Sequence, residues 1–224
     1  FDVIWMRQDP PFDLSYITAT YLLEQLPKSV RVFNDPTGVR ESPEKLAPLN
    51  FKEFMPPTLI SRDVNAIARF AEAHKTIIAK PLYGYGGRSV FKLPSDDPNI
   101  FTLLEHWSEN SREPLMWQAF LPEVHKEDRR IILIDGEIAA VFGRIPKGES
   151  IRANMRVGGE AVAASLTRQQ EKICNAMRPF IQEHGLLFVG LDVIGDYLTE
   201  INVTSPTGLR AVEKLYDKNL AVDI

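Results

Sequence analysis

Two carboxylates and a carboxamide near the end of the chain could together bind a divalent cation. Glu200 and Asn202 lie two residues apart in LTEINVTSP (198–206), where apolar and polar residues alternate as in a half-buried strand. The two side chains therefore share one face of that strand. Asp192 lies on the strand before it. An all-oxygen set of this kind suits Mg²⁺ or Mn²⁺, with phosphate oxygens completing the octahedron.

The turn between the two strands decides whether Asp192 joins this set. A two-residue turn, Gly195-Asp196, would pair Asp192 with Thr199, on the opposite face of the hairpin. A three-residue loop would pair it with Leu198 and place it diagonal to Glu200, with about 5 to 8 Å between the Cβ atoms. The spacing therefore predicts a metal site only if the loop has an odd number of residues. The alternative is a polar stripe on a solvated sheet face.

A second element could bind phosphates. Lys80 ends the apolar run TIIAK, and the loop that follows contains Gly84, Gly86 and Gly87. Glycines let backbone N–H groups approach and surround phosphate oxygens, and the lysine supplies positive charge. The stretch lacks the Gly-Lys-Ser/Thr of a P-loop, and it does not open a helix as a dinucleotide fingerprint does. By itself such a glycine cluster is more often a tight turn.

A third element is MWQAFLPEVHKEDRR (116–130), a strand that runs into a charged loop. Backbone groups along a strand edge can bind adenine, and a carboxylate after the strand can bind ribose hydroxyls. The alternative is an ordinary edge strand with a charged exit.

The elements that must position these residues are of mixed type. Strand and helix patterns alternate from 58 to 93, and Asp135-Gly136 joins two later strands in a hairpin. Ser42 with Pro43 predicts the start of a helix that carries Lys45, made short or kinked by Pro48. A helix at 168–185 is expected to bend or break near Pro179. This order predicts an α+β fold with antiparallel hairpins.

Composition excludes several classes of function. With 224 residues, 44% of them hydrophobic, the chain can bury one large or two modest cores. A net charge of −4 argues against nucleic acid as a partner, and no run approaches the ~20 apolar residues of a membrane span. Cys174 is the single cysteine, which fits a reducing cytoplasm, and no histidine pair suggests zinc. Because the chain begins with Phe1, directly in a strand pattern, we expect a fragment.

Taken together and in order, these elements resemble the ATP-grasp superfamily. More closely, the stretches MRQDPPFD, PEKL, AKPLYGYGG, RIPKGE and GLDVIGDYLTEINVTSPTG are similar to the prokaryotic-type glutathione synthetases. The resemblance covers nearly the whole chain. It implies an ATP-grasp fold, two α+β subdomains holding ATP between them, at 41–224, with a small subdomain at 41–115 and a large one at 116–224. Residues 1–40 would be the end of an N-terminal α/β domain.

The resemblance also implies roles for individual residues. Lys45 and Lys80 would contact the ATP phosphates beneath the loop of Gly84, Gly86 and Gly87. The backbone of Gln118, Ala119, Phe120 and Leu121 would bind adenine, with Asp128 near the ribose. Asp192, Glu200 and Asn202 would hold Mg²⁺ or Mn²⁺. Arg130 and Arg144, with Lys80, would stabilise the transferring phosphoryl group. The substrates would contact Arg130, Arg144, Arg152, Ser205, Pro206 and Thr207.

The implied reaction joins γ-glutamylcysteine to glycine at the expense of ATP. A carboxylate is a poor acyl donor, so it is first converted to an acyl phosphate, and this step needs charge neutralisation more than a nucleophilic side chain. Because an acyl phosphate is hydrolysable, a lid is required, and the cationic loop 145–159 fits that role. Ser205 and Pro206 predict a helix start that would bind a substrate carboxylate.

Two alternatives remain open from the sequence. One is another amino-acid or peptide ligase of the ATP-grasp superfamily, and the other is a nucleotide-binding regulatory module without turnover. The intact set of Lys80, Arg130, Asp192, Glu200 and Asn202 argues against the second. The resemblance also suggests a homo-oligomer.

Overall fold

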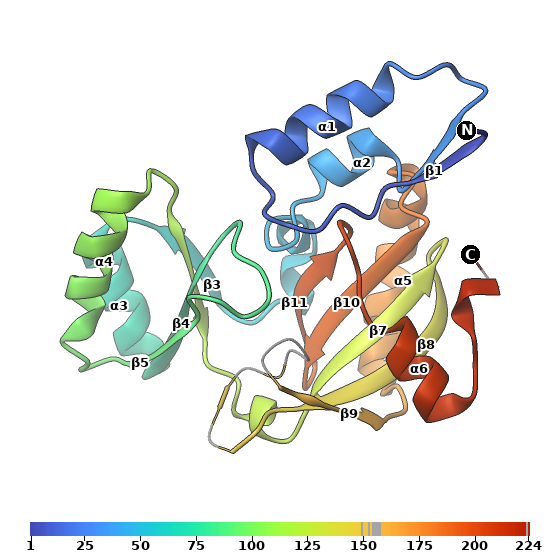
Figure 1. Cartoon of the computed structure of the whole chain (residues 1–224). Helices are drawn as coiled ribbons and strands as arrows, with labels where there is room; N and C mark the ends of the chain where they lie inside the picture. The colour runs from blue at the N-terminus through green and yellow to red at the C-terminus, as the bar shows by residue number, and fades with distance from the viewer. Residues whose placement is uncertain (149, 152, 154–157, 223) are drawn as a thin grey trace.

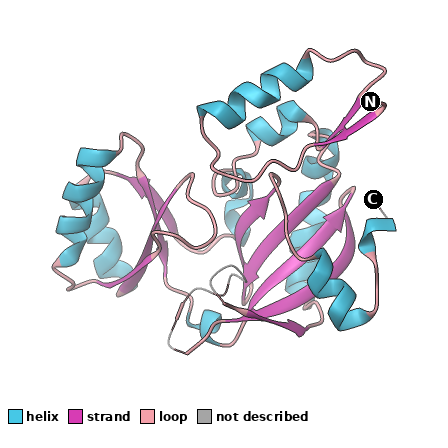
Figure 2. Cartoon of the chain, viewed as in Figure 1, coloured by secondary structure: helices cyan, strands magenta, loops and turns pink. Residues whose placement is uncertain are grey.

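The computed structural model describes residues 1–148, 150–151, 153, 158–222 and 224 (Figure 1). Over these residues the chain builds a four-stranded and a five-stranded antiparallel sheet, together with a short parallel pair near the N-terminus (Figure 2). The α+β architecture with antiparallel hairpins, expected from the sequence, is confirmed. Among the described residues, no helix is both long and apolar enough to cross a membrane.

The smaller sheet has the strand order β3-β6-β4-β5, and α3 and α4 lie against it (Figure 1). Asp63 caps α3 by accepting a hydrogen bond from the backbone N–H of Ala66, which fixes where the helix begins. The elements are β3 (Thr58–Ser61), α3 (Val64–His74), β4 (Thr76–Pro81), β5 (Phe91–Pro94), α4 (Asn99–Asn110) and β6 (Leu115–Ala119).

The pairing of β6 bears on the expected division of the chain after residue 115. The strand pairs with both β3 and β4, and the indole of Trp117 is fully buried in the core of this sheet. A division between residues 115 and 116 would cut β6 at its start. The whole of β6, from Leu115 to Ala119, belongs to the smaller sheet.

The larger sheet has the order β11-β10-β7-β8-β9. Side chains alternate between its faces, so Ile131, Leu191 and their equivalents pack against Ile173 and Met177 of α5. The short helix α6 packs against the other face, near Phe142. The elements are β7 (Asp128–Ile134), β8 (Glu137–Ile145), β9 (Glu160–Ala163), α5 (Arg168–Glu183), β10 (Phe188–Ile194), β11 (Tyr197–Asn202) and α6 (Leu209–Tyr216).

Two local expectations for this sheet have clear outcomes. The Asp135-Gly136 hairpin is confirmed, because Ile134 pairs directly with Glu137 and both turn residues have positive φ. Of the bend or break expected near Pro179, the break is wrong, since α5 is one helix that contains this proline.

The N-terminal segment packs beside the upper end of β10 and β11 (Figure 1). It contains β1 (Val3–Trp5), α1 (Leu14–Glu24), β2 (Arg31–Phe33), α2 (Pro36–Glu41) and the 3₁₀ helix η1 (Ala47–Phe54). A last 3₁₀ turn, η4 (Leu220–Val222), follows α6.

The expected helix starting at Ser42 and Pro43 is also wrong. Helix α2 begins earlier, where Asp35 caps the N–H of Gly38 and Pro36 occupies the first turn. It ends at Glu41, because a residue before proline avoids the helical region, and Ser42 has φ −118° and ψ 58°. Lys45 therefore lies in the turn between α2 and η1 rather than on an α-helix.

Candidate active site

A first cavity, of about 120 Å³, lies between the two sheets. Its walls come from β4, the glycine loop and the end of β6 on one side. On the other side they come from residues of β7, β10 and β11, among them Asp128, Asp192 and Glu200. They include every residue that the sequence predicts for nucleotide binding, namely Lys45, Lys80, Gly84, Gly86, Gly87, Gln118, Ala119, Phe120, Leu121 and Asp128. The structure thus brings this set together around one space.

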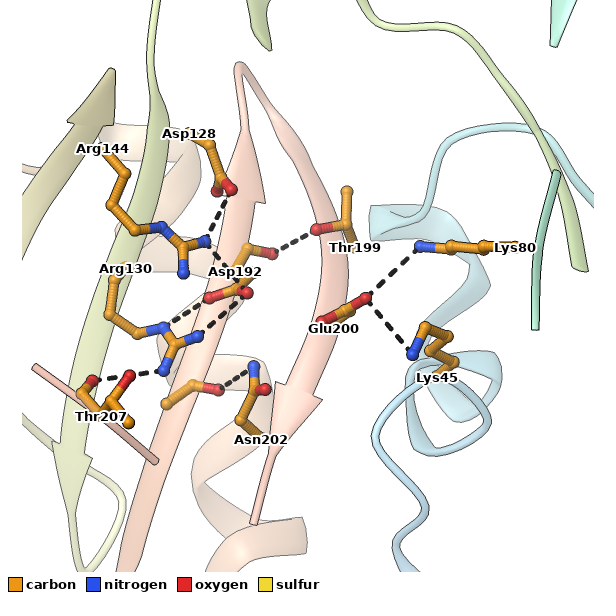
Figure 3. A network of polar contacts seen from close by, with 11 residues as sticks. Lys45, Lys80, Asp128, Arg130, Arg144, Asp192, Thr199, Glu200, Asn202 and Thr207 are labelled. Atoms are coloured by element: carbon orange, nitrogen blue, oxygen red, sulfur yellow. Dashed lines mark hydrogen bonds and ion pairs between the residues drawn. The ribbon is translucent and has the colours of Figure 1, made fainter. Parts of the chain in front are cut away.

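Two lysines enter this cavity from different elements. The ammonium group of Lys45 donates to the carbonyl oxygen of Gly84, which ties the turn after α2 to the glycine loop. The Nζ atoms of Lys45 and Lys80 lie 3.7 and 3.8 Å from one carboxylate oxygen of Glu200 (Figure 3). Burial lowers the pKa of Lys80, an effect that Glu200 opposes and the charge of Lys45 reinforces.

A row of polar side chains crosses the larger sheet beside the lysines (Figure 3). By register, Phe142 pairs with Arg130, Arg130 with Asp192, and Asp192 with Glu200. The guanidinium of Arg130 makes two hydrogen bonds to the carboxylate of Asp192, at 2.5 and 3.1 Å. A side chain at Gly190 would interfere with this contact, because its Cβ would lie 2.9 Å from Nη1 of Arg130.

The pairing of Asp192 with Glu200 corrects both turn models. The turn has two residues, since Ile194 pairs with Tyr197, yet Asp192 faces Glu200 rather than Thr199. A β-bulge makes the difference: Thr199 is inserted in β11, and its hydroxyl donates to the carbonyl of Asp192 at 3.1 Å. A one-residue bulge has the same effect on register as an odd loop, so the carboxylates converge.

A signal for this bulge is present in the sequence. Leu198 and Ile201 both lie in the core beneath the sheet, although they are three positions apart. A regular strand would place them on opposite faces. The break in apolar alternation at 198–201 therefore marks the inserted residue.

Asp192 is the most strongly paired of the buried carboxylates. Besides Arg130, it accepts from Arg144 at 3.0 Å, and Arg144 also pairs with Asp128 at 2.6 Å. Burial alone would raise the pKa of Asp192, but the two guanidinium groups hold it below its ordinary value. For Asp128, burial outweighs the attraction of Arg144 and raises the pKa to about 6. Despite the effect of burial, Asp128 and Asp192 raise the pKa of Arg144.

The oxygen atoms of this row fit a divalent cation. Asn202 donates its amide nitrogen to the carbonyl of Gly190 at 3.2 Å, which leaves its amide oxygen as a ligand. Asp192 and Glu200 add two carboxylates on the same face. Within the described ranges there is no cluster of three or more His, Cys, Asp or Glu side chains that could hold a metal ion. The donor set here is two carboxylates and an amide, so further ligands would come from phosphate and water.

A second cavity, of about 400 Å³, adjoins the first across Asp192, Glu200 and the glycine loop. Four of the residues predicted to contact the substrates line it, namely Arg130, Arg144, Ser205 and Thr207. Pro206 does not, and its carbonyl oxygen instead accepts from Arg7 at 2.9 Å. Arg152 and positions 149 and 154–157 of the predicted lid lie outside the described residues, whereas Ile151 and Ala153 line the first cavity.

The predicted helix start at Ser205 and Pro206 is wrong. Helix α6 begins at Leu209, with Gly208 before it at φ +130°. The segment 203–208 is instead a loop, in which Arg130 donates to the carbonyl of Thr207 at 3.3 Å and Arg7 donates to that of Pro206 at 2.9 Å. No free helix N-terminus is available at Ser205.

Sequence reasoning missed three residues of the site. Tyr85, between the loop glycines, lines both cavities. Arg88, after the loop, lines the first. Glu44 lines the second, and its position directly before Lys45 was the available signal.

Comparisons with protein families match both parts of the chain. Residues 44–217 match the family described as prokaryotic glutathione synthetase, ATP-grasp domain, and residues 1–40 match the N-terminal domain of the same enzymes. The glutathione synthetase of Rhodopseudomonas palustris is 49% identical over the whole chain, which covers 72% of that protein. That of Agrobacterium fabrum is 50% identical over 98% of the chain and 69% of its own length.

Solved structures agree on the fold. A D-cycloserine synthetase superposes with a TM-score of 0.71 at 16% identity, over 92% of this chain and 77% of that one. The D-alanine–D-alanine ligase of Bacillus anthracis, complexed with ATP, gives 0.68 at 15% identity, over 99% and 77%. At such identities the likeness concerns the fold alone.

Proposed function

Because the chain belongs to the prokaryotic glutathione synthetase family and is an ATP-dependent ligase that forms glutathione from γ-glutamylcysteine and glycine with Mg²⁺, we propose that its two adjoining cavities divide this reaction. The first cavity binds ATP and the second binds the peptide and amine substrates. One observation carries the assignment. Asp192 and Glu200 line both cavities, with two lysines on the side of the first cavity and Arg130 on the side of the second.

In this proposal, Lys45 and Lys80 bind the ATP phosphates, and the glycine loop closes over them. The strand end at Gln118 to Leu121 binds adenine, and Asp128 lies on the ribose side. Asp192, Glu200 and Asn202 hold Mg²⁺ or Mn²⁺, which when bound neutralises charge on the phosphate oxygens. The cations of the protein act on the same charge and need no rearrangement, since their partners already fix them.

Arg130 and Arg144 act on the substrate side. Both are buried and oriented by Asp192, so they can bind the peptide carboxylate and stabilise the transferring phosphoryl group. Ser205 and Thr207 bind the peptide, and Pro206 helps indirectly by anchoring the segment to Arg7. Arg152 and the loop 145–159 exclude water from the acyl phosphate.

Three broader assignments belong to the same proposal. We divide the chain into the end of an N-terminal domain at 1–40 and an ATP-grasp domain from residue 41, whose halves meet after Ala119. The enzyme works as a homo-oligomer. It resides in the cytoplasm, which suits Cys174, a buried thiol without a disulfide.

The test is phosphate release from Mg-ATP. The protein should release phosphate only with both γ-glutamylcysteine and glycine present, and the product should be glutathione. Lys80→Met should weaken nucleotide binding about 10- to 100-fold, the loss of one or two charged hydrogen bonds. Lys52→Met, at an exposed lysine of η1, is the matched control. Nucleotide binding by Lys80→Met equal to that of the control would overturn the phosphate assignment.

A further inference from the structure

The second cavity has cationic and acidic walls. Arg130 and Arg144 lie on β7 and β8, whereas Asp9 and Glu44 approach from the N-terminal segment. The arginines suit the carboxylate and phosphoryl groups of the reaction. Both amino substrates also carry an ammonium group, for which the assignments above provide no partner.

Glu44 is fixed at this wall by β11. Its backbone carbonyl accepts a hydrogen bond from the N–H of Ile201 at 2.9 Å. Ile201 lies between Glu200 and Asn202, the two proposed metal ligands of that strand. One carboxylate oxygen accepts from the hydroxyl of Thr204 at 2.8 Å. The side chain is therefore held beside the reacting centre by two contacts to the same segment.

Glu44 differs from the other acids of the site in its partners. Asp128 and Asp192 pair with arginines, and Glu200 lies near both lysines. Over the described part of the chain, no cation lies within ion-pair distance of Glu44. Lys45, its neighbour in sequence, extends away to Gly84 and Glu200.

We propose that Glu44 is the ammonium-binding residue of the second cavity, and that it receives the charged amino group of one of the two amino substrates. This inference rests on the proposed assignment of that cavity to the substrates. A carboxylate on a cavity wall without a cation of its own is the partner that an ammonium group requires. Burial, reinforced by Glu200, raises the pKa of Glu44, and a bound ammonium group would oppose this shift.

The ammonium group has two sources, glycine and the γ-glutamyl residue. Glu44→Gln keeps the shape and the oxygen that accepts from Thr204 but removes the charge. We expect the KM of the substrate whose ammonium group it binds to rise about 10- to 100-fold, with nucleotide affinity and thermal midpoint unchanged. An unchanged KM for both substrates would overturn the proposal.

Hydroxylamine separates the two sources. It is largely uncharged near neutral pH and attacks acyl phosphates, giving a hydroxamate. If Glu44 binds glycine, Glu44→Gln should form the hydroxamate at the wild-type rate and lose only the reaction with glycine. If it binds the γ-glutamyl residue, the raised KM for the peptide should appear with either nucleophile.

Two further variants exclude a structural role. Thr204→Val leaves the charge and should change each KM by less than about threefold, whereas a loss equal to that of Glu44→Gln would overturn the proposal. Glu137→Gln removes an exposed carboxylate that pairs with Arg178, and it should behave as wild type. Failure of the wild-type protein to form either glutathione or hydroxamate would instead refute the proposed function of the cavity.

Discussion

Substitution of Asp192 by Asn should separate the structural role of this carboxylate from its proposed role as a metal ligand. Its side chain is 6% exposed and accepts from two guanidinium groups that are themselves 6% and 4% exposed. Asn lacks the charge and offers one oxygen rather than two. The variant leaves both arginines buried, with Asp128 as the remaining carboxylate partner in the described network.

The expected cost follows from this burial. Removal of one partner from a buried ion pair costs about 3–5 kcal/mol, because the other charge stays behind without compensation. For a chain of this size each kcal/mol lowers the thermal midpoint by about 2–4 °C, so we expect a fall on the order of 10 °C. Glu200→Gln differs, because its carboxylate is 23% exposed and lies 3.7 and 3.8 Å from the lysines. It should cost at most about 1 kcal/mol.

Urea unfolding followed by fluorescence and by circular dichroism measures the difference, and coincident transitions validate its free energies. Both variants should lose glutathione synthesis, so activity does not distinguish them and stability does. Glu137→Gln, in an exposed pair with Arg178, is the control and should stay within about 0.5 kcal/mol of wild type. A free energy of unfolding for Asp192→Asn equal to that of Glu200→Gln would refute the argument from burial.

Three other predictions concern single sites. Gly208→Ala should destabilise the protein by about 2–5 kcal/mol in a thermal melt, because φ is +130° and the new Cβ would lie 2.7 Å from the ring of Phe142; an unchanged midpoint would contradict this. Gly190→Ala would place its Cβ 2.9 Å from Nη1 and 3.1 Å from Cδ of the buried Arg130, which must shift from Asp192, so glutathione synthesis and the thermal midpoint should both fall, and full activity would count against the role of Arg130. Burial raises the pKa of Cys174 to about 12, so iodoacetamide should label the thiol only after unfolding, and labelling of the native protein would disprove its burial. Since only the unfolded thiol ionises above about pH 9, stability should fall by about 1.4 kcal/mol per pH unit from there towards pH 12.

Local chemistry was predictable wherever it followed from alternation or from a glycine dipeptide. Glu200 and Asn202 needed only the period of a strand, and the Asp135-Gly136 hairpin needed only its turn residues. The bulge at Thr199 does not follow from the length of the turn, so the turn alone gives the wrong register. The apolar pattern held the information, since Leu198 and Ile201 both require the core.

Predictions of helix starts are wrong where two possible capping signals lie close together in the sequence. Pro36 and Pro43 both follow a residue that can cap a helix, and the structure uses Asp35 with Pro36. The predicted helix start at Ser205 and Pro206 is wrong because of tertiary contacts. Arg7 and Arg130 donate hydrogen bonds to the carbonyls of Pro206 and Thr207. The sequence around Ser205 gives no sign of these two arginines, because they come from other segments.

Charge balance explains how so many ionisable groups can share this face of the sheet. Four cations meet four acids, and the acids differ in how completely they are paired. Asp192 has two arginines, Asp128 has one, Glu200 has two distant lysines, and Glu44 has a hydroxyl. Strong pairing fixes geometry, whereas weak pairing leaves a charge for a ligand to satisfy. The order from Asp192 to Glu44 thus runs from scaffold to binding group, which is why their substitutions should divide between stability and substrate affinity.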